Sequence, residues 1–530
     1  MNQCINDKLL NSAAGKHWKK IGVHPHHGIN VPLFSLHSQK SCGIGEFPDL
    51  LPLIPWCLEV GIDTIQLLPL NDTGNDSSPY NALSAFALNP LHLGLSQLPN
   101  IEKYADLKEK ISLLRRFNGT KRVQYREIIS LRREILRQYA QREYVHFGDD
   151  ENYQSYIEKN SWLEGYALFL VLKREYSWSS WETWPKEIAH PSKEMLQELL
   201  AKYREGVCRE MFIQYLCFQQ LKEVKDMAEK NGLFIKGDIP ILISRDSADV
   251  WLNRSLFKMD FSAGAPPDMY NPNGQNWGFP VYDWEEIERC QYEWWLKRLS
   301  LASMFYHIYR IDHIVGFFRI WSIPRGKGNG GYFIPEDEAL WIDHGKKIML
   351  EMLRECSMLP IGEDLGVVPT NVKKCLEELG ICGTRVMRWE RKWEEDQSFI
   401  APCDYMLESM TTVSTHDSEP LSLWWKNSTR EAQDFAQSKR WQYESRISQD
   451  QLYEILRDSH CSRSLFHINL FQEYLTLIPG MTSDKLEDER VNVPGKNSEK
   501  NWSYRFIPSV EEIVSHQELK NVIRSLTLNT

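Results

Sequence analysis

Three short polar motifs in this chain place carboxyl groups beside groups that can tune them. The first is Tyr309-Arg310-Ile311-Asp312-His313, at the end of an alternating apolar run. Positions i and i+2 of a strand face the same side, so Arg310 can lie beside Asp312 and keep it ionised. Such a carboxylate suits a nucleophile. The alternative is a purely structural Arg–Asp pair at a strand end.

The second motif, Glu363-Asp364-Leu365-Gly366, joins two carboxyl groups directly after an apolar run. Adjacent carboxylates repel each other, so one of them tends to stay protonated nearer to neutrality. A raised pKa is what a general acid requires. The alternative is that Asp364 caps a helix that follows it.

The third motif is Ser414-Thr415-His416-Asp417. His416 and Asp417 can hydrogen-bond to sugar hydroxyls, and the alternative is a helix cap or a turn. No nearby serine lies in a nucleophile elbow, which argues against a hydrolase triad. Cleaving a glycosidic bond with retention requires two carboxyl groups about 5–5.5 Å apart, and the first two motifs supply a candidate pair.

These motifs follow short β-rich apolar runs that alternate with helical stretches, the pattern of an α/β protein. Because the carboxyl ends of barrel strands form the active-site face, we predict a (β/α)8 TIM barrel. An eighth strand is poorly marked and is expected near Arg490–Val493. The other seven predicted strands are Val31–Leu36, Thr64–Leu68, Leu233–Ile241, Tyr306–Ile311, Leu359–Ile361, Thr384–Met387 and Thr411–Thr415.

The chain of 530 residues is long enough for one barrel with large helical insertions. Residues 1–27 are expected to form an N-terminal extension and residues 28–530 the catalytic barrel. Lys, Arg, Glu and Leu at helical spacing predict a helical insertion at 100–231, between the second and third strands, and a second helical segment at 427–478. The tail after Met481 is too short for a separate C-terminal β-sandwich.

The formal net charge of −10 argues against a general nucleic-acid binder and fits a neutral substrate. The apolar runs are short and interrupted by charge, so no membrane span is expected. Residues 1–28 lack the apolar segment of a secretory signal. The 11 cysteines are scattered singly, without a CxxC pair, which suits free thiols in a reducing, cytoplasmic compartment.

No cofactor motif, EF-hand loop or zinc-type Cys/His spacing is found. His24, His26 and His27 cluster around Pro25, where we expect a solvated turn rather than a metal site. The sequence therefore predicts no metal and no cofactor. It also predicts that chelation leaves activity and melting temperature unchanged.

Taken in order, the three motifs closely resemble the signature regions of the α-amylase superfamily. Further segments resemble the amylomaltase, or 4-α-glucanotransferase, family (glycoside hydrolase family 77), over about Gly28 to Arg505. The matching segments are SPY (78–80), SAFALNP (84–90), GDIPI (237–241), DSADVW (246–251), GAPPD (264–268), GQNWG (274–278), RIDHIVGF (310–317), EDLG (363–366), RVNVPG (490–495) and NW (501–502).

The resemblance implies a retaining 4-α-glucanotransferase. Asp312 is similar to the family's nucleophile, Glu363 to its general acid/base and Asp417 to its transition-state stabiliser. The implied donor is a maltodextrin or a glycogen- or starch-derived glucan, the implied acceptor is glucose or a maltodextrin, and no oligomeric state is indicated. The positions that resemble substrate contacts are Ser78, Tyr80, Asp238, Asp268, Gln275, Trp277, Arg310, His313 and His416.

Two alternatives compete with transfer. An α-amylase-like hydrolase would be expected to carry a DxxxNH region, which is not found here. A non-catalytic glycan-binding barrel would commonly have lost a catalytic acid, and this chain keeps all three. The Pro- and aromatic-rich loop Gly264–Pro280 is expected to cover the site and hold off water, which favours transfer. The departures from the family pattern, such as Leu88 in place of glycine, lie in loops.

Overall fold

Eight parallel strands form a barrel in chain order. The computed structural model describes residues 3–267, 272–328, 330–496 and 498–528. Each barrel strand pairs with the next one along the chain, β1 pairs with β14, and a parallel bridge between Ile361 and Cys382 joins β11 to the start of β12. The prediction of a TIM barrel is confirmed. The strands are β1 (His26–Asn30), β2 (Thr64–Gln66), β3 (Phe234–Ile239), β8 (Ile308–Ile311), β11 (Leu359–Gly362), β12 (Gly383–Val386), β13 (Ser409–Thr412) and β14 (Phe466–Leu470).

Six of the predicted strands are confirmed within a few residues, but the first is misplaced. Strand β1 ends at Asn30, and the expected strand at Val31–Leu36 is instead a 3-10 turn at Leu33–Ser35. Pro32 precedes this turn and has no N–H to donate to a ladder, so a central strand cannot continue through it. The solvated turn expected around Pro25 is found at His24 and Pro25, which are exposed. It does not extend to His26 and His27, which belong to β1, and His26 is fully buried.

The eighth strand is β14 and not a segment near Arg490–Val493. It lies inside the segment 427–478 that was predicted to be helical. All five residues of β14 are buried, and a short buried run between two helices gives no periodicity that separates strand from helix. The expected boundary at residue 28 also falls within β1.

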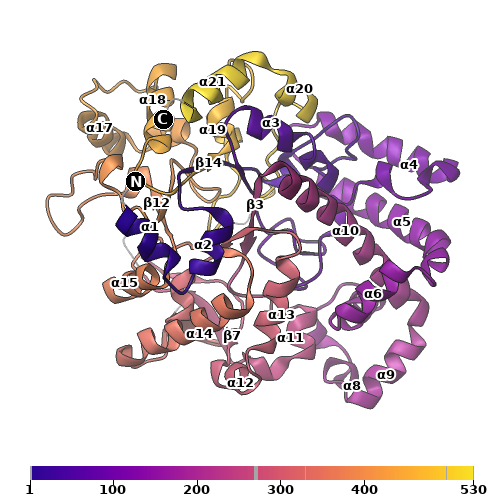
Figure 1. The fold of residues 1–530 in the computed structure, drawn as a ribbon. Helices are drawn as coiled ribbons and strands as arrows, with labels where there is room; N and C mark the ends of the chain where they lie inside the picture. Colours follow the sequence, from indigo (N-terminus) through magenta and orange to yellow (C-terminus); the bar gives the residue numbers. More distant parts are fainter. Residues whose placement is uncertain (1–2, 268–271, 329, 497, 529–530) are drawn as a thin grey trace.

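The insertion between β2 and β3 is helical as predicted, and it occupies the right-hand side of Figure 1. Its long last helix packs against α5 and α7 and leads into β3. That helix ends where Gly232 takes a left-handed conformation (φ 78°), which suits glycine. The helices of the insertion are α4 (Ala105–Arg115), α5 (Tyr125–Glu143), α6 (Glu151–Lys159), α7 (Leu163–Glu175), α8 (Lys186–Ala189), α9 (Lys193–Lys202) and α10 (Arg204–Asn231).

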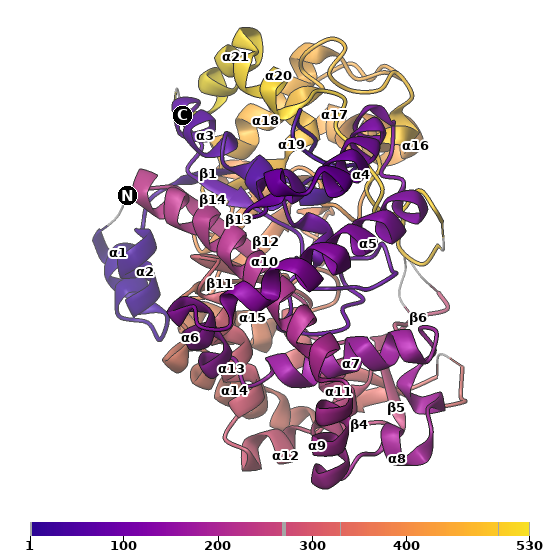
Figure 2. The same cartoon turned by 90° about the vertical axis from the view of Figure 1, so that its right-hand side faces the viewer.

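The remaining connections also carry helices, which lie around the barrel (Figure 2). The link between β12 and β13, residues 387–408, is an exception and contains only 3-10 turns. Apart from the helices at the two ends of the chain, the helices outside the insertion are α3 (Leu53–Glu59), α11 (Ala248–Leu252), α12 (Trp284–Arg289), α13 (Glu293–Ala302), α14 (Trp341–Glu355), α15 (Thr370–Leu379), α16 (Leu421–Asn427), α17 (Thr429–Ser438), α18 (Gln449–His460) and α19 (Phe471–Leu475).

The loops that follow β3 and β8 form two small antiparallel sheets. The larger runs in the order β10-β9-β5-β6, and β4 pairs with β7. Their strands are β4 (Phe257–Lys258), β5 (Phe261–Ala265), β6 (Gln275–Asn276), β7 (Val281–Tyr282), β9 (Ile320–Pro324) and β10 (Tyr332–Ile334). Loops at the carboxyl end of the barrel are therefore tied together by their own hydrogen bonds.

Both ends of the chain are helical. Helix α1 (Gln3–Leu10) and helix α2 (Gly15–Ile21) lie beside the barrel, and the Trp18 indole donates a 2.8 Å hydrogen bond to the Gly380 carbonyl after α15. Helices α20 (Val510–Ser515) and α21 (Gln517–Thr527) finish the chain, and α21 packs on α18 and α19. The described part of the tail contains no β-sandwich.

Two further expectations from the sequence concern the cysteines and membrane-spanning helices. The ten cysteines from Cys42 onward are all free thiols. Among the described residues, no helix has both the length and the apolar character to cross a membrane.

Candidate active site

Asp312 and Glu363 come directly after neighbouring barrel strands. Strand β8 ends at Ile311 and β11 ends at Gly362, and these two residues are register partners. The Glu363 N–H donates to the Ile311 carbonyl at 2.9 Å, which extends the ladder by one residue. The two carboxyl groups that the sequence analysis selected are therefore neighbours at the carboxyl end of the barrel, where barrel enzymes hold their active sites.

Arg310 joins the carboxylates of this end. Its Nη1 lies 2.9 Å from both oxygens of Asp238 and 2.8 Å from Asp312, and its Nη2 lies 3.9 Å from Glu363. Asp238 is its register partner on β3. Burial alone would lower the pKa of Arg310, but Asp238 and Asp312 raise it well above its ordinary value. We call Asp238, Asp312 and Glu363 around Arg310 the carboxylate cluster.

Glu363 is set up as the protonated member of the cluster. Burial raises its pKa, Asp312 adds to the rise, and Arg310 opposes it. Backbone N–H groups of His313 and Leu365 donate to its two oxygens at 2.8 and 3.3 Å and hold the carboxyl group in place. His313 has a left-handed backbone (φ 47°), which is uncommon for a residue other than glycine and marks a specialised turn.

The neighbouring Asp364 has a different role from the one predicted. Its contribution to the raised pKa of Glu363 is the smallest of the named causes, and it does not cap a helix. Instead, it accepts a 2.7 Å hydrogen bond from the Thr384 N–H and pairs with Arg385 at 3.1 Å. A Cβ on Gly383 would come within 2.5 Å of this carboxylate. Asp364 therefore ties β11 to β12.

A second polar group lies beside the cluster. The Tyr80 hydroxyl donates to Asp238 at 2.8 Å and lies 2.9 Å from Nε2 of His416. The same nitrogen is 3.3 Å from Asp417. Tyr80, from the loop after β2, thereby connects the carboxylate cluster to the motif after β13.

Asp417 is held as an anion. Asn492 donates to its Oδ1 at 2.7 Å. Burial alone would raise the pKa of Asp417, but its interactions with His416 and Asn492 lower the pKa to about 2. At neutral pH the site therefore combines an ionised Asp417 with a Glu363 whose pKa is raised. Two carboxyl groups with oppositely shifted pKa values are the usual basis of acid/base assignments.

The remaining predicted contacts lie on the loops around this site. The Trp277 indole packs edge-on against the His313 ring at 5.1 Å and donates to Gln275 at 3.0 Å. Ser78 stands two residues before Tyr80, with its N–H donating to Asp76 at 2.8 Å. Asp268 lies outside the described residues.

The loop Gly264–Pro280 is partly a β-hairpin. Gly264 on β5 pairs with Asn276 on β6, and the Trp277 N–H donates to the Ala263 carbonyl at 2.9 Å. Gly264 has no room for a side chain, because a Cβ would lie 2.0 Å from the Gln275 carbonyl oxygen. Backbone pairing thus fixes the position of Trp277 beside His313.

Two residues without a role predicted from the sequence also lie at this site. Asn492 contacts Asp417 directly, and the Trp502 ring lies 5.5 Å from the Tyr80 ring and 6.0 Å from that of His416. Both residues belong to the C-terminal segments RVNVPG and NW that resembled the family. The match of these segments to the family was the only feature of the sequence that pointed to Asn492 and Trp502.

Comparisons with known proteins agree with this geometry. A family model described as 4-alpha-glucanotransferase matches residues 31–509. A 4-alpha-glucanotransferase of Chlamydia pneumoniae is 45% identical over 511 residues, which cover 96% of each chain. One of Clostridium butyricum is 29% identical and covers 87% of this chain and 92% of its own.

Solved structures show the same fold. An amylomaltase from Streptococcus agalactiae, in complex with acarbose, superposes with a TM-score of 0.80 at 24% identity, covering 95% of this chain and 98% of its own. The amylomaltase from Corynebacterium glutamicum gives a TM-score of 0.77 at 22% identity and covers 97% and 76%. The family match over most of the chain, with the carboxyl groups gathered at the carboxyl end of the barrel, shows that this chain belongs to the 4-α-glucanotransferase family.

Proposed function

We propose that Asp312 is the nucleophile and Glu363 the general acid/base of a retaining transfer between α-1,4-glucans. The observation that carries this proposal is the position of Arg310, which pairs with Asp238 and Asp312 and lies near Glu363. Its guanidinium lies 2.8 Å from Asp312 and orients that carboxylate, while burial raises the pKa of Glu363 and so favours its protonated form. One carboxylate is then ready to attack and the other to donate.

The reaction takes place in two balanced steps. An Asp312 oxygen attacks the anomeric carbon of the donor while Glu363 protonates the leaving 4-oxygen, which gives a glycosyl ester on Asp312 and releases the shortened glucan. Glu363 then removes the proton from the 4-hydroxyl of the acceptor, whose oxygen attacks the same carbon and frees Asp312. The donor is a maltodextrin or a glycogen- or starch-derived glucan, and the acceptor is glucose or a maltodextrin.

The groups around the two carboxyls orient the sugar. Asp417 is anionic and stands beside His416, so both can hydrogen-bond to hydroxyls of the ring being cleaved and stabilise its positive charge in the transition state. The Tyr80 hydroxyl lies between His416 and Asp238, within hydrogen-bond distance of both, and holds their side chains in position. The face of Trp277 offers an apolar surface to the C–H groups of glucose.

Transfer rather than hydrolysis requires that the acceptor is bound and water is kept away from the ester. The hairpin that carries Gln275 and Trp277 is anchored by backbone pairing next to His313, the residue that follows the nucleophile. Acceptor sugars bound against Trp277 would occupy the space through which water reaches the ester. This supports the transfer reaction over an α-amylase-like hydrolysis on the same barrel.

The test traps the intermediate. In Glu363→Gln, an α-glucosyl fluoride should still glycosylate Asp312, because fluoride leaves with little protonation, and the ester should accumulate for lack of a base. Mass spectrometry of the intact protein should show one added glycosyl mass, and peptide mapping should place it on Asp312. The control is the double variant with Asp312→Asn, which should show no added mass.

Two results would count against the assignment. An added mass on another residue would remove Asp312 as nucleophile, and normal turnover of maltotriose by Glu363→Gln would move the acid/base role to Asp364 or elsewhere.

Incubating the native enzyme with maltotriose separates the reaction classes. Longer maltodextrins with glucose mean transfer, shorter sugars alone mean hydrolysis, and no change means binding without catalysis.

A further inference from the structure

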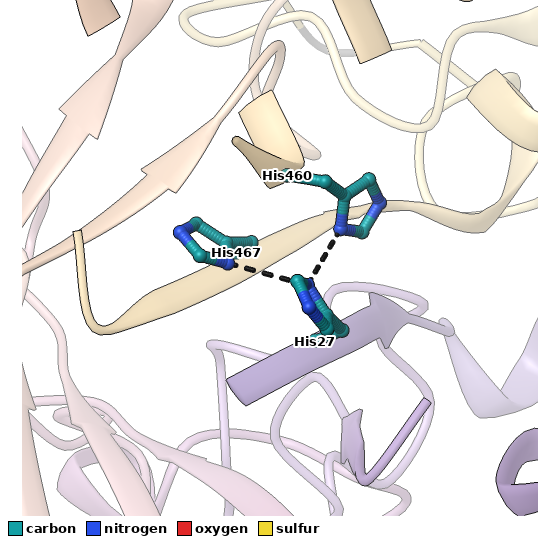
Figure 3. A group of neighbouring side chains, drawn as sticks. All are labelled: His27, His460 and His467. Atoms are coloured by element: carbon teal, nitrogen blue, oxygen red, sulfur yellow. Dashed lines mark hydrogen bonds between the residues drawn. The ribbon is translucent and has the colours of Figure 1, made fainter. Parts of the chain in front are cut away.

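Three histidine rings from distant parts of the chain converge between β1, β14 and helix α18 (Figure 3). His27 lies on β1, His467 on β14, and His460 is the last residue of α18. Nδ1 of His27 lies 2.8 Å from Nδ1 of His460 and 3.2 Å from Nδ1 of His467. We call these residues the histidine cluster.

The cluster lies at the end of the barrel opposite to the carboxylate cluster. His27 and His467 are register partners and are the second residues of their strands, whereas Asp312 and Glu363 follow the last residues of theirs. Strands β1 and β14 are the first and last of the barrel, so the cluster spans the seam at which the barrel closes.

Strand alternation places the cluster between the sheet and its helices. Lys236 on β3 contacts Gln66 on β2 and Met410 on β13, a strand that is not adjacent to β3, so these side chains point into the barrel. Asn30 is the register partner of Gln66 and shares its face. His27, three residues earlier, faces the other way, toward α18.

Hydrogen bonding does not satisfy this arrangement. A neutral imidazole has one N–H and one lone pair. Nε2 of His467 lies 3.1 Å from the Ser462 carbonyl, which only accepts, so its Nδ1 presents a lone pair. If Nδ1 of His27 donates its hydrogen to that lone pair, it has no second hydrogen for His460, so a single N–H must be shared between the two rings and bonds weakly to each. If it accepts from His460 instead, two lone pairs face each other across 3.2 Å.

The three rings are neutral, as metal ligands must be. Burial lowers the pKa of His27 to about 4 and that of His467 to about 3, and it lowers the pKa of His460 well below its ordinary value. A cation placed among the three nitrogens would accept all three lone pairs.

We propose that His27, His460 and His467 bind one divalent transition-metal ion, such as Zn²⁺, through their Nδ1 atoms. Imidazole nitrogen is a preferred ligand for such ions. Zn–N bonds of about 2.0–2.1 Å in a tetrahedron place the nitrogens about 3.3 Å apart. The Nδ1 of His27 lies 3.2 Å from that of His467, close to this value, and 2.8 Å from that of His460, about 0.5 Å shorter. His27 is half-buried, so a water molecule can complete the tetrahedron from its side.

The proposed role is structural. The ion would connect β1 to β14 and to the end of α18, residues that are more than 430 positions apart along the chain. Because the unfolded chain does not preform this site, binding would stabilise the folded barrel. The carboxyl end of the barrel is not involved, so the ion takes no part in the transfer.

A neighbouring group provides the natural control. His24, His26 and Asp63 also gather their ligand atoms, but His26 already pairs with Asp63 at 2.7 Å and His24 is exposed. His24→Gln removes a ligand from this second group and leaves the histidine cluster intact. His460→Gln does the reverse.

The test uses the full chain, stripped with a chelator that is then removed, and titrated with Zn²⁺. We expect one tightly bound equivalent and a rise in Tm of about 2 °C or more, both lost in His460→Gln and both kept in His24→Gln. Equal Zn²⁺ uptake by native protein and His460→Gln would overturn the proposal. Loss of binding in His24→Gln alone would assign the ion to the other group and overturn it equally.

A second measurement avoids variants, since His460→Gln could fail to fold. Crystals of the native chain grown with Zn²⁺ are measured at the zinc absorption edge. We expect one strong anomalous peak bounded by the three Nδ1 atoms, about 2 Å from each. The proposal is rejected if the region between the rings shows no peak, or if the peak lies beside His24, His26 and Asp63.

Discussion

The two ends of this barrel use polar side chains in opposite ways. At the carboxyl end, Arg310 pairs with the charged groups of the carboxylate cluster, and Asn492 and His416 hold Asp417 ionised. At the amino end, three neutral rings turn their Nδ1 atoms toward one another across the seam of the sheet. In the proposed functions, the carboxyl end develops and moves charge, and the amino end connects strands.

This difference follows from the barrel itself. The loops that follow the strands bring side chains from several parts of the chain to the carboxyl end of the barrel. These loops can vary without changing the barrel, so this end can carry different chemistries, whereas the amino end mainly contributes to stability. Changes at the carboxyl end should therefore alter rate with little change in Tm, and changes at the histidine cluster should alter Tm with little change in rate. The predictions below test this separation.

The largest expected effect is on the proposed nucleophile. Asp312→Asn keeps the shape of the side chain but removes its charge, so maltotriose disproportionation should fall by more than about 100-fold, with glucan binding retained. Product analysis by chromatography measures the rate, and calorimetry measures binding. The matched variant His460→Gln should keep a rate within about twofold of native. Asp312→Asn with more than about a hundredth of the native rate would contradict the assignment.

The second prediction concerns pH. Glu363 must be protonated to donate, and its raised pKa keeps the proton to higher pH than in an ordinary glutamic acid. Activity should therefore fall as pH rises through that raised pKa, about tenfold per pH unit beyond it. Fluoride release from an α-glucosyl fluoride, which needs little protonation, should lack this alkaline limb. If activity on maltotriose and fluoride release both fell at the same alkaline pH, the fall would be due to the titration of a group other than Glu363.

Third, Asn492→Ala removes one hydrogen bond to the anionic Asp417. A hydrogen bond to a charged group contributes about 1.5–3 kcal/mol, so kcat/KM for maltotriose should fall roughly tenfold or more. The control Asn521→Ala changes an exposed asparagine on α21 and should leave kcat/KM unchanged. A native kcat/KM in folded Asn492→Ala would show that Asp417 does not depend on this contact.

A smaller effect is expected for Trp277→Ala. If the indole binds the acceptor and keeps water out, the ratio of hydrolysis to transfer should rise by about threefold, because an exposed aromatic contact to a ligand contributes of the order of 1 kcal/mol. Glucose released and glucan transferred are measured in one reaction. An unchanged ratio with a lowered Tm would mean that Trp277 only anchors the hairpin to His313.

The smallest expected effect is that of chelation on rate. The histidine cluster lies away from the reacting carboxyls, so exhaustive chelation should leave kcat unchanged while lowering Tm. The initial prediction of an unchanged Tm is thereby revised by the proposed metal site. A large loss of kcat, restored by Zn²⁺, would show that the two ends of the barrel are coupled.

Much of the active site could be predicted from the sequence, since its residues lie in short contiguous motifs. Arg310 and Asp312 share a strand face by simple alternation, and the structure places them 2.8 Å apart. Repulsion within the pair Glu363-Asp364 predicted a raised pKa for one of the two carboxyl groups, and the resemblance to the family pointed to Glu363. The pKa of Glu363 is raised, but burial is the main cause, and Asp364 bonds to Thr384 and Arg385. The spacing of residues along the chain shows which side chains are neighbours, but it does not show how deeply each one is buried.

Other features depend on contacts between distant segments. β14 is short and fully buried, so no periodicity distinguished it from the helices on either side. Tyr80 reaches Asp238 and His416, 158 and 336 residues away, only because the strands of the barrel bring their ends together.

The sequence by itself determined the (β/α)8 class, the order of the carboxyl groups along the strands and the family to which they belong. These are properties of motifs and periodicity within short windows. Only the tertiary structure decided which carboxyl group has a raised pKa and which residues meet at the seam, because both depend on burial and on barrel closure. His27 appeared to belong with His24 and His26, but the closed barrel places it with His460 and His467.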